Sequence, residues 1–408
     1  MQSILSFREG ITMPILIQPA DLRASADLAA DIRHRIHRHP ETGLYLPHTE
    51  EVILEALQTF GVDEIHTRVG GPDVSGIVAV IRGTRPGRTV GLRADSDALP
   101  LSEKTGCPWS SETPGRMHAC GHDGHVATLL AAVHWLAAHR DFAGTLCAIF
   151  QPGEEGYAGG RHMIEDGLVE RFGIDEFYAL HAEISVPVGS VAFVPGYATA
   201  NADVFEIEFE GKGGHGSRPH LARDPVVAAG EALLALQTIP SRSVEPGKAA
   251  VVSVCSLTAG NTGGTSVIPQ KALLRGTTRS FEPEVQDTIE TRMKQIAEGI
   301  ALANDMTAEV RYTRLYPAMY NDPDRTADAR ALAEALLGSD RVETFRRTPG
   351  GEDFSFMLRA RPGCLFRLGM RDETHTAGVH NEGFDFNDRA IPVGAAVLLT
   401  VALNRMRK

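Results

Sequence analysis

The segment His118–His125 carries a dense set of metal-binding side chains. Its eight residues, H-A-C-G-H-D-G-H, include three histidines, one cysteine and one aspartate. Imidazole and thiolate are the ligands that zinc and similar divalent ions prefer. A helical apolar pattern follows directly, so we expect these side chains to lie on a tight turn. The alternative is a helix-start loop in which Asp123 caps the helix and the histidines are solvated.

Three further loops offer ligands of the same kinds. Glu154 and Glu155 are adjacent in Q-P-G-E-E-G, at the end of an apolar run that predicts a buried strand. Adjacent carboxylates point in different directions, so one can bind a metal while the other faces water. His181 follows a short apolar run, and His380 lies in G-V-H-N-E-G-F. Either histidine alone is more often a hydrogen-bonded or solvent-facing side chain than a metal ligand. The ligand candidates from the four loops are Cys120, His122, Glu155, His181 and His380, about as many as two close divalent ions need.

Strands and helices alternate in the first half of the chain. The pattern predicts helices over 22–38 and 49–59 around a Pro/Gly break at 39–43, strands over 76–81, 89–92 and 144–151, and a helix over 125–139. This order predicts an α/β domain with a mostly parallel sheet and flanking helices. In such sheets, functional groups collect at the carboxyl ends of the strands. Asp95 and Asp97 fall at one such end, where capping of the turn is the alternative for Asp97.

A different pattern begins after residue 197. We predict a strand over 203–210, a helix over 225–236, strands over 249–257 and 271–278, a helix over 282–303 and a strand over 307–313. This βαββαβ order is that of a ferredoxin-like α+β domain. Helices over 325–337 and 392–406 return to the first pattern. We therefore expect a discontinuous catalytic domain, 1–198 and 314–408, with a smaller domain inserted over 199–313.

Composition excludes several classes of protein. The 408 residues carry a formal charge of −12 and are 43% hydrophobic, which argues against nucleic acid or an anionic membrane as the main partner. No run of 18 apolar residues occurs, so we expect no membrane span. Arg8 and Glu9 interrupt the N-terminal apolar stretch, which argues against a secretion signal. Met13 is a second candidate start, which would make residues 1–12 a poorly ordered extension.

The five cysteines are widely spaced and include no C-x-x-C pair. An odd number at such spacing is typical of reduced thiols in a cytoplasmic protein, not of a disulfide framework.

Five motifs resemble those of the M20 metallopeptidase family. They are H-A-C-G-H-D-G-H, the Q-P-x-E-E loop, R-A-D-x-D-A-L-P at 93–100, G-K-G-G-H-G-S at 211–217 and G-E-D-F-S-F at 351–356. The similarity runs in order from residue 33 to residue 395. It is strongest to the amidohydrolase branch that includes hippurate hydrolase, N-acyl-amino-acid deacylases and plant auxin-conjugate hydrolases.

The resemblance implies a role for each candidate residue. Cys120 would bridge two divalent ions, with His122 and His181 completing one ligand set and Glu155 and His380 the other. Glu154 would be the general base, and Asp95 would orient a histidine ligand. The ions would be zinc, manganese, nickel or cobalt.

The resemblance also assigns residues of the smaller domain. His215 would help to stabilise the tetrahedral oxyanion. Arg279, in R-G-T-T-R, would bind a substrate carboxylate, although a solvated strand-end arginine is the alternative. Ser266 departs from the family, which usually has Asn before V-I-P. The inserted domain would serve as a lid and a pairing surface in a homodimer or homotetramer.

The expected reaction is hydrolysis of N-acetyl or N-benzoyl amino acids to a carboxylate and a free amino acid. A dipeptidase or aminopeptidase of the same superfamily is the nearest alternative. A thiol hydrolase that uses Cys120 with His122 or His125 is an alternative of another class. A non-catalytic binding protein is a third, against which the presence of both Glu154 and Glu155 argues.

Overall fold

The computed structural model describes residues 13–407. The expectations for residues 1–12 lie outside the described residues. The chain divides into two compact units. The first comprises Met1–Pro195, Asn321–Phe345 and Met357–Lys408, and the second comprises Gly196–Tyr320 and Arg346–Phe356.

The first unit is built on an eight-stranded sheet with the order β1-β2-β4-β3-β5-β16-β6-β15. The strands are β1 (Glu64–His66), β2 (Ile77–Arg82), β3 (Arg85–Asp95), β4 (Ala143–Gln151), β5 (Glu176–Pro187), β6 (Val191–Phe193), β15 (Val342–Thr344) and β16 (Gly363–Arg371). The central strands β4, β3, β5 and β16 are parallel, whereas β1, β2 and β4 pair antiparallel, as do β16 and β6. The predicted α/β class with flanking helices is confirmed.

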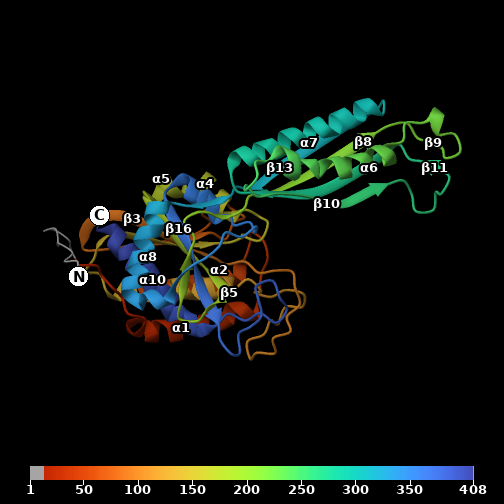
Figure 1. Cartoon of the computed structure of the whole chain (residues 1–408). Coiled ribbons are helices and arrows are strands. Elements are labelled where there is room, and N and C mark those ends of the chain that lie inside the picture. The colour runs from red at the N-terminus through yellow and green to blue at the C-terminus, as the bar shows by residue number, and fades with distance from the viewer. Residues whose placement is uncertain (1–12, 408) are drawn as a thin grey trace. The chain divides into compact units, whose positions relative to one another are not determined.

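Helices cover both faces of this sheet (Figure 1). They are α1 (Arg23–Arg38), α2 (Pro47–Phe60), α3 (His122–Ala138), α4 (Gly159–Glu165), α5 (Leu168–Phe172), α8 (Pro323–Leu337) and α10 (Ile391–Met406). Helix α9 (Phe354–Ala360) begins in the segment assigned to the second unit. Along β4, Leu146, Ala148 and Phe150 join the core that includes α1, α3 and α10, while Cys147 and Ile149 are buried on the other face. Burial on both faces explains the unbroken apolar sequence of this strand.

Helix α10 is apolar around most of its circumference. Together with the preceding turn, from Asp388 to Met406, it is long and apolar enough to cross a bilayer, but 78% of its most apolar stretch is buried inside the unit. It therefore has the surroundings of a core helix.

The second unit has a four-stranded antiparallel sheet with the order β10-β12-β8-β13. Its elements are β7 (Gly196–Thr199), β8 (Ala202–Glu210), β9 (Gly214–His215), α6 (Pro225–Leu236), β10 (Ala250–Ala259), β11 (Val267–Ile268), β12 (Lys271–Ser280), α7 (Pro283–Ala303), β13 (Thr307–Tyr316) and β14 (Met319–Asn321). Phe205, Ile207 and Phe209 of β8 pack in one core with residues of α6 and α7. The alternate residues, Glu206 and Glu208, face away from this core, as expected for a strand with one solvated face.

The observed units differ from the predicted boundaries in one notable segment. Residues 346–356, expected in the catalytic domain, belong to the second unit. Thr348 forms a bridge with Thr199, and Arg347 lies 3.2 Å from Glu282. These contacts are made by residues distant in the sequence, so local pattern does not indicate them.

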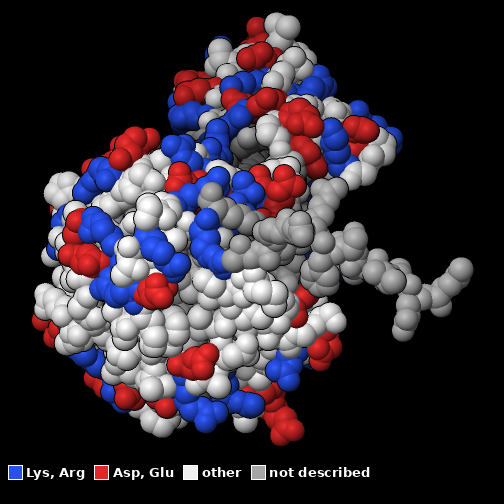
Figure 2. Space-filling view, turned by 90° about the vertical axis from the view of Figure 1, so that its left-hand side faces the viewer, with Lys and Arg blue, Asp and Glu red and all other residues white. Residues whose placement is uncertain are grey.

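Acidic and basic side chains are interspersed on the face seen in Figure 2, where neither sign forms one continuous field. On the solvated face of the second unit's sheet, Glu206 pairs with Arg275 and Glu208 with Lys271.

Candidate metal centre

The turn that precedes α3 delivers Cys120 and His122. Gly121, between them, has φ of 88°, a left-handed conformation that glycine adopts readily. A Cβ at this position would meet the Phe386 ring at 3.2 Å and Ala182 at 3.3 Å. The glycine therefore allows both the turn and the close approach of β5, the strand that carries His181.

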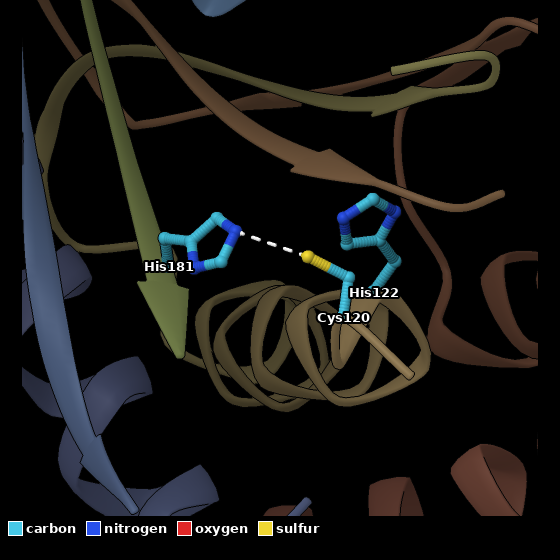
Figure 3. A group of neighbouring side chains, drawn as sticks. All are labelled: Cys120, His122 and His181. Atoms are coloured by element: carbon cyan, nitrogen blue, oxygen red, sulfur yellow. Dashed lines mark hydrogen bonds between the residues drawn. The ribbon is translucent and has the colours of Figure 1, made fainter. Parts of the chain in front are cut away.

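His181 lies within β5, not at its end as expected. The pairing of β5 with β3 stops at Ala179, and β5 continues to Pro187 alongside β16. The His181 side chain therefore stands just beyond the last residue pair with β3. Its Nε2 lies 3.4 Å from the Cys120 Sγ, and the two groups point toward one another in Figure 3.

Two groups of possible ligands share Cys120. In the first, the ligand atoms of Cys120, His122 and His181 lie within 4.8 Å of one another. In the second, those of Cys120, Glu155 and His380 do so. One sulfur common to two sets is the arrangement that a bridging thiolate requires. The residues nominated from the sequence as metal ligands are thus together in the first unit.

The loop of His380 is held against the loop of Cys120. The backbone N–H of His380 donates a 2.7 Å hydrogen bond to the carbonyl of Ala119. His380 has φ of 62°, a conformation that is uncommon for any residue other than glycine. Its Nε2 lies 3.2 Å from the Oε1 of Glu155. The left-handed backbone conformation of His380 thus occurs at the position where its side chain contacts the Glu155 carboxylate.

The electrostatics of this cluster fit divalent cations. Both ring nitrogens of His122 are buried, and within the described residues neither has a hydrogen-bond partner. Burial and nearby Arg367 lower the pKa of His181, which favours the neutral imidazole that binds metal. Burial raises the pKa of the Cys120 thiol to about 12. A cation is therefore needed to stabilise its thiolate at neutral pH.

Asp97 organises the neighbouring Glu154–Glu155 loop. Its Oδ1 accepts the backbone N–H of Glu154 at 2.9 Å, and its Oδ2 accepts that of Glu155 at 3.0 Å. Glu154 is 8% exposed, and one of its carboxylate oxygens lies within 4.8 Å of ligand atoms of His122 and Glu155. Asp97 therefore does more than cap a turn: it holds the backbone that carries two adjacent carboxylates.

Asp95 bonds a histidine that the sequence did not nominate as a ligand. Its Oδ1 lies 2.5 Å from Nδ1 of His125, whereas its Oδ2 is 3.6 Å from Nε2 of His122. His125 in turn accepts the backbone N–H of Ala182 at Nε2, 2.9 Å away. Asp95 thus acts on the β5 backbone next to His181 through His125.

Arg93 is a further residue that the sequence reasoning missed. It is fully buried, and it donates to Oδ2 of Asp95 at 2.8 Å and to Gln151 at 2.9 Å. Burial alone would raise the pKa of Asp95, but Arg93 and the nearby histidines hold that pKa well below its usual range. The sequence does indicate this pair, because Arg93 and Asp95 are two residues apart on a strand and so lie on the same face.

His215 and Arg279 belong to the second unit. His215 is exposed on β9, where its Nδ1 lies 3.0 Å from the Ser217 hydroxyl. Ser266, the departure from the family pattern, holds this loop through its carbonyl, which accepts the N–H of Gly216 at 2.7 Å. Arg279 is half-buried on β12 and donates to the carbonyl of Thr278 at 2.8 Å.

Known proteins resemble the chain over nearly its whole length. The model of peptidase family M20/M25/M40 matches residues 91–404. Hippurate hydrolase of Campylobacter jejuni is 35% identical over 381 residues, covering 92% of this chain and 96% of that protein. N-acetyldiaminopimelate deacetylase of Anoxybacillus flavithermus is 35% identical over 368 residues, covering 90% and 95%.

The solved structures agree. The YXEP protein of Bacillus subtilis, described as a dinuclear metal binding peptidase from the M20 family, superposes with a TM-score of 0.82 at 30% identity, covering 94% of this chain and 99% of that chain. The family expected from the motifs is confirmed. The chain belongs to peptidase family M20/M25/M40.

Proposed function

We propose that this protein is a dinuclear metal amidohydrolase that cleaves N-acyl amino acids to a carboxylate and a free amino acid. The observation that carries the proposal is the pair of ligand sets sharing Cys120, next to a carboxylate fixed by Asp97. Relatives named hippurate hydrolase and N-acetyldiaminopimelate deacetylase support this substrate class.

In this proposal, His122 and His181 with Cys120 hold one ion, and Glu155 and His380 with Cys120 hold the other. Two divalent ions, when bound, supply a water of lowered pKa and a polarised amide carbonyl. Zinc, nickel, cobalt and manganese all suit a mixed sulfur, nitrogen and oxygen set, so the donors alone do not select among them.

Glu154 is the proposed general base. Its carboxylate would accept a proton from the attacking water and return it to the leaving nitrogen of the amide. Its small exposure favours this role, because a buried carboxylate is shielded from competing solvent. Asp97 would keep Glu154 directed at the reacting atoms while Glu155 faces the metal.

We assign two roles to the second unit. His215 would donate a hydrogen bond to the oxyanion through Nε2, since Nδ1 is near the Ser217 hydroxyl. Arg279 would bind the substrate carboxylate. The edge strand β10 of this lid domain would pair with a second copy, giving a homodimer or homotetramer.

A cytoplasmic location follows from the same reasoning. The five cysteines are free of disulfides in the part of the chain that the structure describes, which suits a reducing compartment. The net charge of −12 argues against nucleic acid and anionic membranes as partners.

A substrate panel tests the proposal. Metal-reconstituted protein should hydrolyse N-acetyl and N-benzoyl amino acids with higher kcat/KM than unblocked dipeptides. A second candidate, peptidase action, is favoured by a 34% identical relative named thermostable carboxypeptidase 1, from Saccharolobus solfataricus. If the protein hydrolyses dipeptides or longer peptides but not N-acyl amino acids, it is a peptidase and the proposal is wrong. Activity that survives chelation but not alkylation of Cys120 would point to a thiol hydrolase.

A further inference from the structure

A second group of metal-binding side chains lies in the first unit, outside the centre described above. The ligand atoms of His37, Cys107 and Asp385 lie within 4.8 Å of one another. Glu103 adds a fourth donor, with Oε2 at 3.3 Å from the His37 Nε2 and Oε1 at 3.8 Å from the Cys107 Sγ. Sulfur, nitrogen and carboxylate oxygen thus converge at one place.

His37 is oriented as a metal ligand would be. Its side chain is fully buried, and its Nδ1 lies 2.7 Å from Oδ2 of Asp123. Its Nε2 is also buried and, among the described residues, has no partner with hydrogen-bond geometry. A carboxylate on one ring nitrogen and a metal on the other is the usual environment of a ligating histidine. This nitrogen faces the Glu103 carboxylate, 3.3 Å away, and lies beside Cys107 and Asp385.

The carboxylates are themselves held in place. Glu103 Oε2 accepts the backbone N–H of Ser111 at 2.6 Å. Asp385 accepts hydrogen bonds at Oδ1 from Arg33 and, at 3.2 Å, from the Trp109 indole. Both contacts use Oδ1, so Oδ2 is available to a cation. Ligands whose orientation is fixed by outer contacts are typical of a built metal site.

We propose that His37, Glu103, Cys107 and Asp385 bind a third divalent ion, of the zinc class. Thiolate, imidazole and carboxylate are all zinc ligands, and one thiolate, one imidazole and two carboxylates complete a four-coordinate set from the protein alone. The ligands come from α1, from the loop between β3 and α3, and from the loop before α10. The ion would fasten these three segments together beside Asp123, the residue after His122.

Cobalt substitution tests this site without relying on activity. A thiolate bound to Co²⁺ gives a near-ultraviolet charge-transfer band, and Cys120→Ser removes the contribution of the first centre. Cys120→Ser should retain this band after Co²⁺ loading and gel filtration, and additional Cys107→Ser should abolish it. Cys255→Ser, at an exposed cysteine, is the matched control and should leave the band intact.

Zinc content and thermal unfolding provide an independent reading. Cys107→Ser in the otherwise native protein should bind one equivalent of Zn²⁺ fewer than Ser110→Ala, which alters the same loop but removes no ligand. Zn²⁺ should also raise the Tm of Ser110→Ala more than that of Cys107→Ser, because ligands that bind only the folded state stabilise it. Equal zinc content and equal Tm shifts, or no cobalt band in Cys120→Ser, would overturn the proposal. The two catalytic ions are counted separately, so either inference can fail alone.

Discussion

The carboxylate of Asp97 accepts the backbone N–H of Glu154 at 2.9 Å. Its other oxygen accepts the next backbone N–H, that of Glu155, at 3.0 Å. A single side chain therefore holds the backbone of the proposed general base and of a proposed metal ligand. Asp97 touches no reacting atom in this account and acts by positioning.

The first prediction concerns this clamp. In Asp97→Asn, one side-chain oxygen is replaced by an N–H₂ donor that faces another donor, so the 154–155 loop should shift. We expect kcat to fall about 10²-fold, the scale of a displacement near 1 Å at a reacting group. Asp141→Asn, at an exposed aspartate, is the control. Wild-type kcat in Asp97→Asn would show that the clamp does not position Glu154.

The adjacent glutamates should separate by function. Glu154→Gln should retain its metal and lose about 10²- to 10⁴-fold in kcat, because a general base is removed. Glu155→Gln should instead lower metal content. Metal analysis of both variants, beside their kinetics, distinguishes the two effects. A fully active Glu154→Gln variant would contradict the proposed mechanism.

A third prediction follows from the buried ion pair between Arg405 and Glu176. The Arg405 Nη2 lies 2.6 Å from Glu176 Oε1 at the foot of β5. Burial opposes ionisation of Glu176, but the hydrogen bonds from Arg405 and Tyr178 hold its pKa below the usual value. Stability from this group is therefore present above the unfolded pKa of about 4.3 and is lost as pH falls through the lower folded pKa.

Glu176→Gln should accordingly reduce the free energy of unfolding by about 3 kcal/mol at pH 7, since it leaves a buried cation short of a partner. Asp328 still pairs with Arg405, which limits the cost. Urea unfolding across pH should show the difference from wild type shrinking below pH about 4. A difference that is constant with pH would refute the electrostatic origin, and exposed Glu170→Gln should have little effect.

The fourth prediction addresses His215. His215→Ala should lower kcat while both ions stay bound, since an oxyanion donor is worth about 2.7–4 kcal/mol in the transition state. If His215 acts across a dimer, mixing Glu154→Gln with His215→Ala subunits after dissociation creates one intact site per mixed dimer. Activity should partly return. Heterodimers without recovered activity would assign His215 to its own subunit's site or to no catalytic role.

Much of the fold was predictable because its elements carry strong local patterns. The predicted helix over 225–236 coincides with α6, and the predicted strand over 144–151 lies within β4. The residues predicted as metal ligands lie close together in the structure, in two sets that share Cys120. Their roles as ligands stay a prediction. Density of histidine and cysteine was the signal.

The parts that escaped prediction depend on distant partners. The bond between Asp95 and His125 joins β3 to α3, and no periodicity indicates which histidine a carboxylate selects. Cys107 looked like an isolated thiol, because Asp385 is far away in the sequence. Residues 346–356 were expected in the catalytic domain, whereas the structure groups them with the second unit. Their contacts there are with residues distant in the sequence, which local patterns do not indicate.

The most direct test of the account is the metal content of Cys120→Ser, with Cys147→Ser, at a buried cysteine outside both ligand sets, as control. Cys120 is common to both ligand sets, so its loss should weaken both catalytic ions together. After dialysis against a moderate chelator, Cys147→Ser should match wild type, and Cys120→Ser should contain two equivalents fewer and be inactive on N-acyl amino acids. Loss of one equivalent or none from Cys120→Ser would contradict a shared, bridging thiolate.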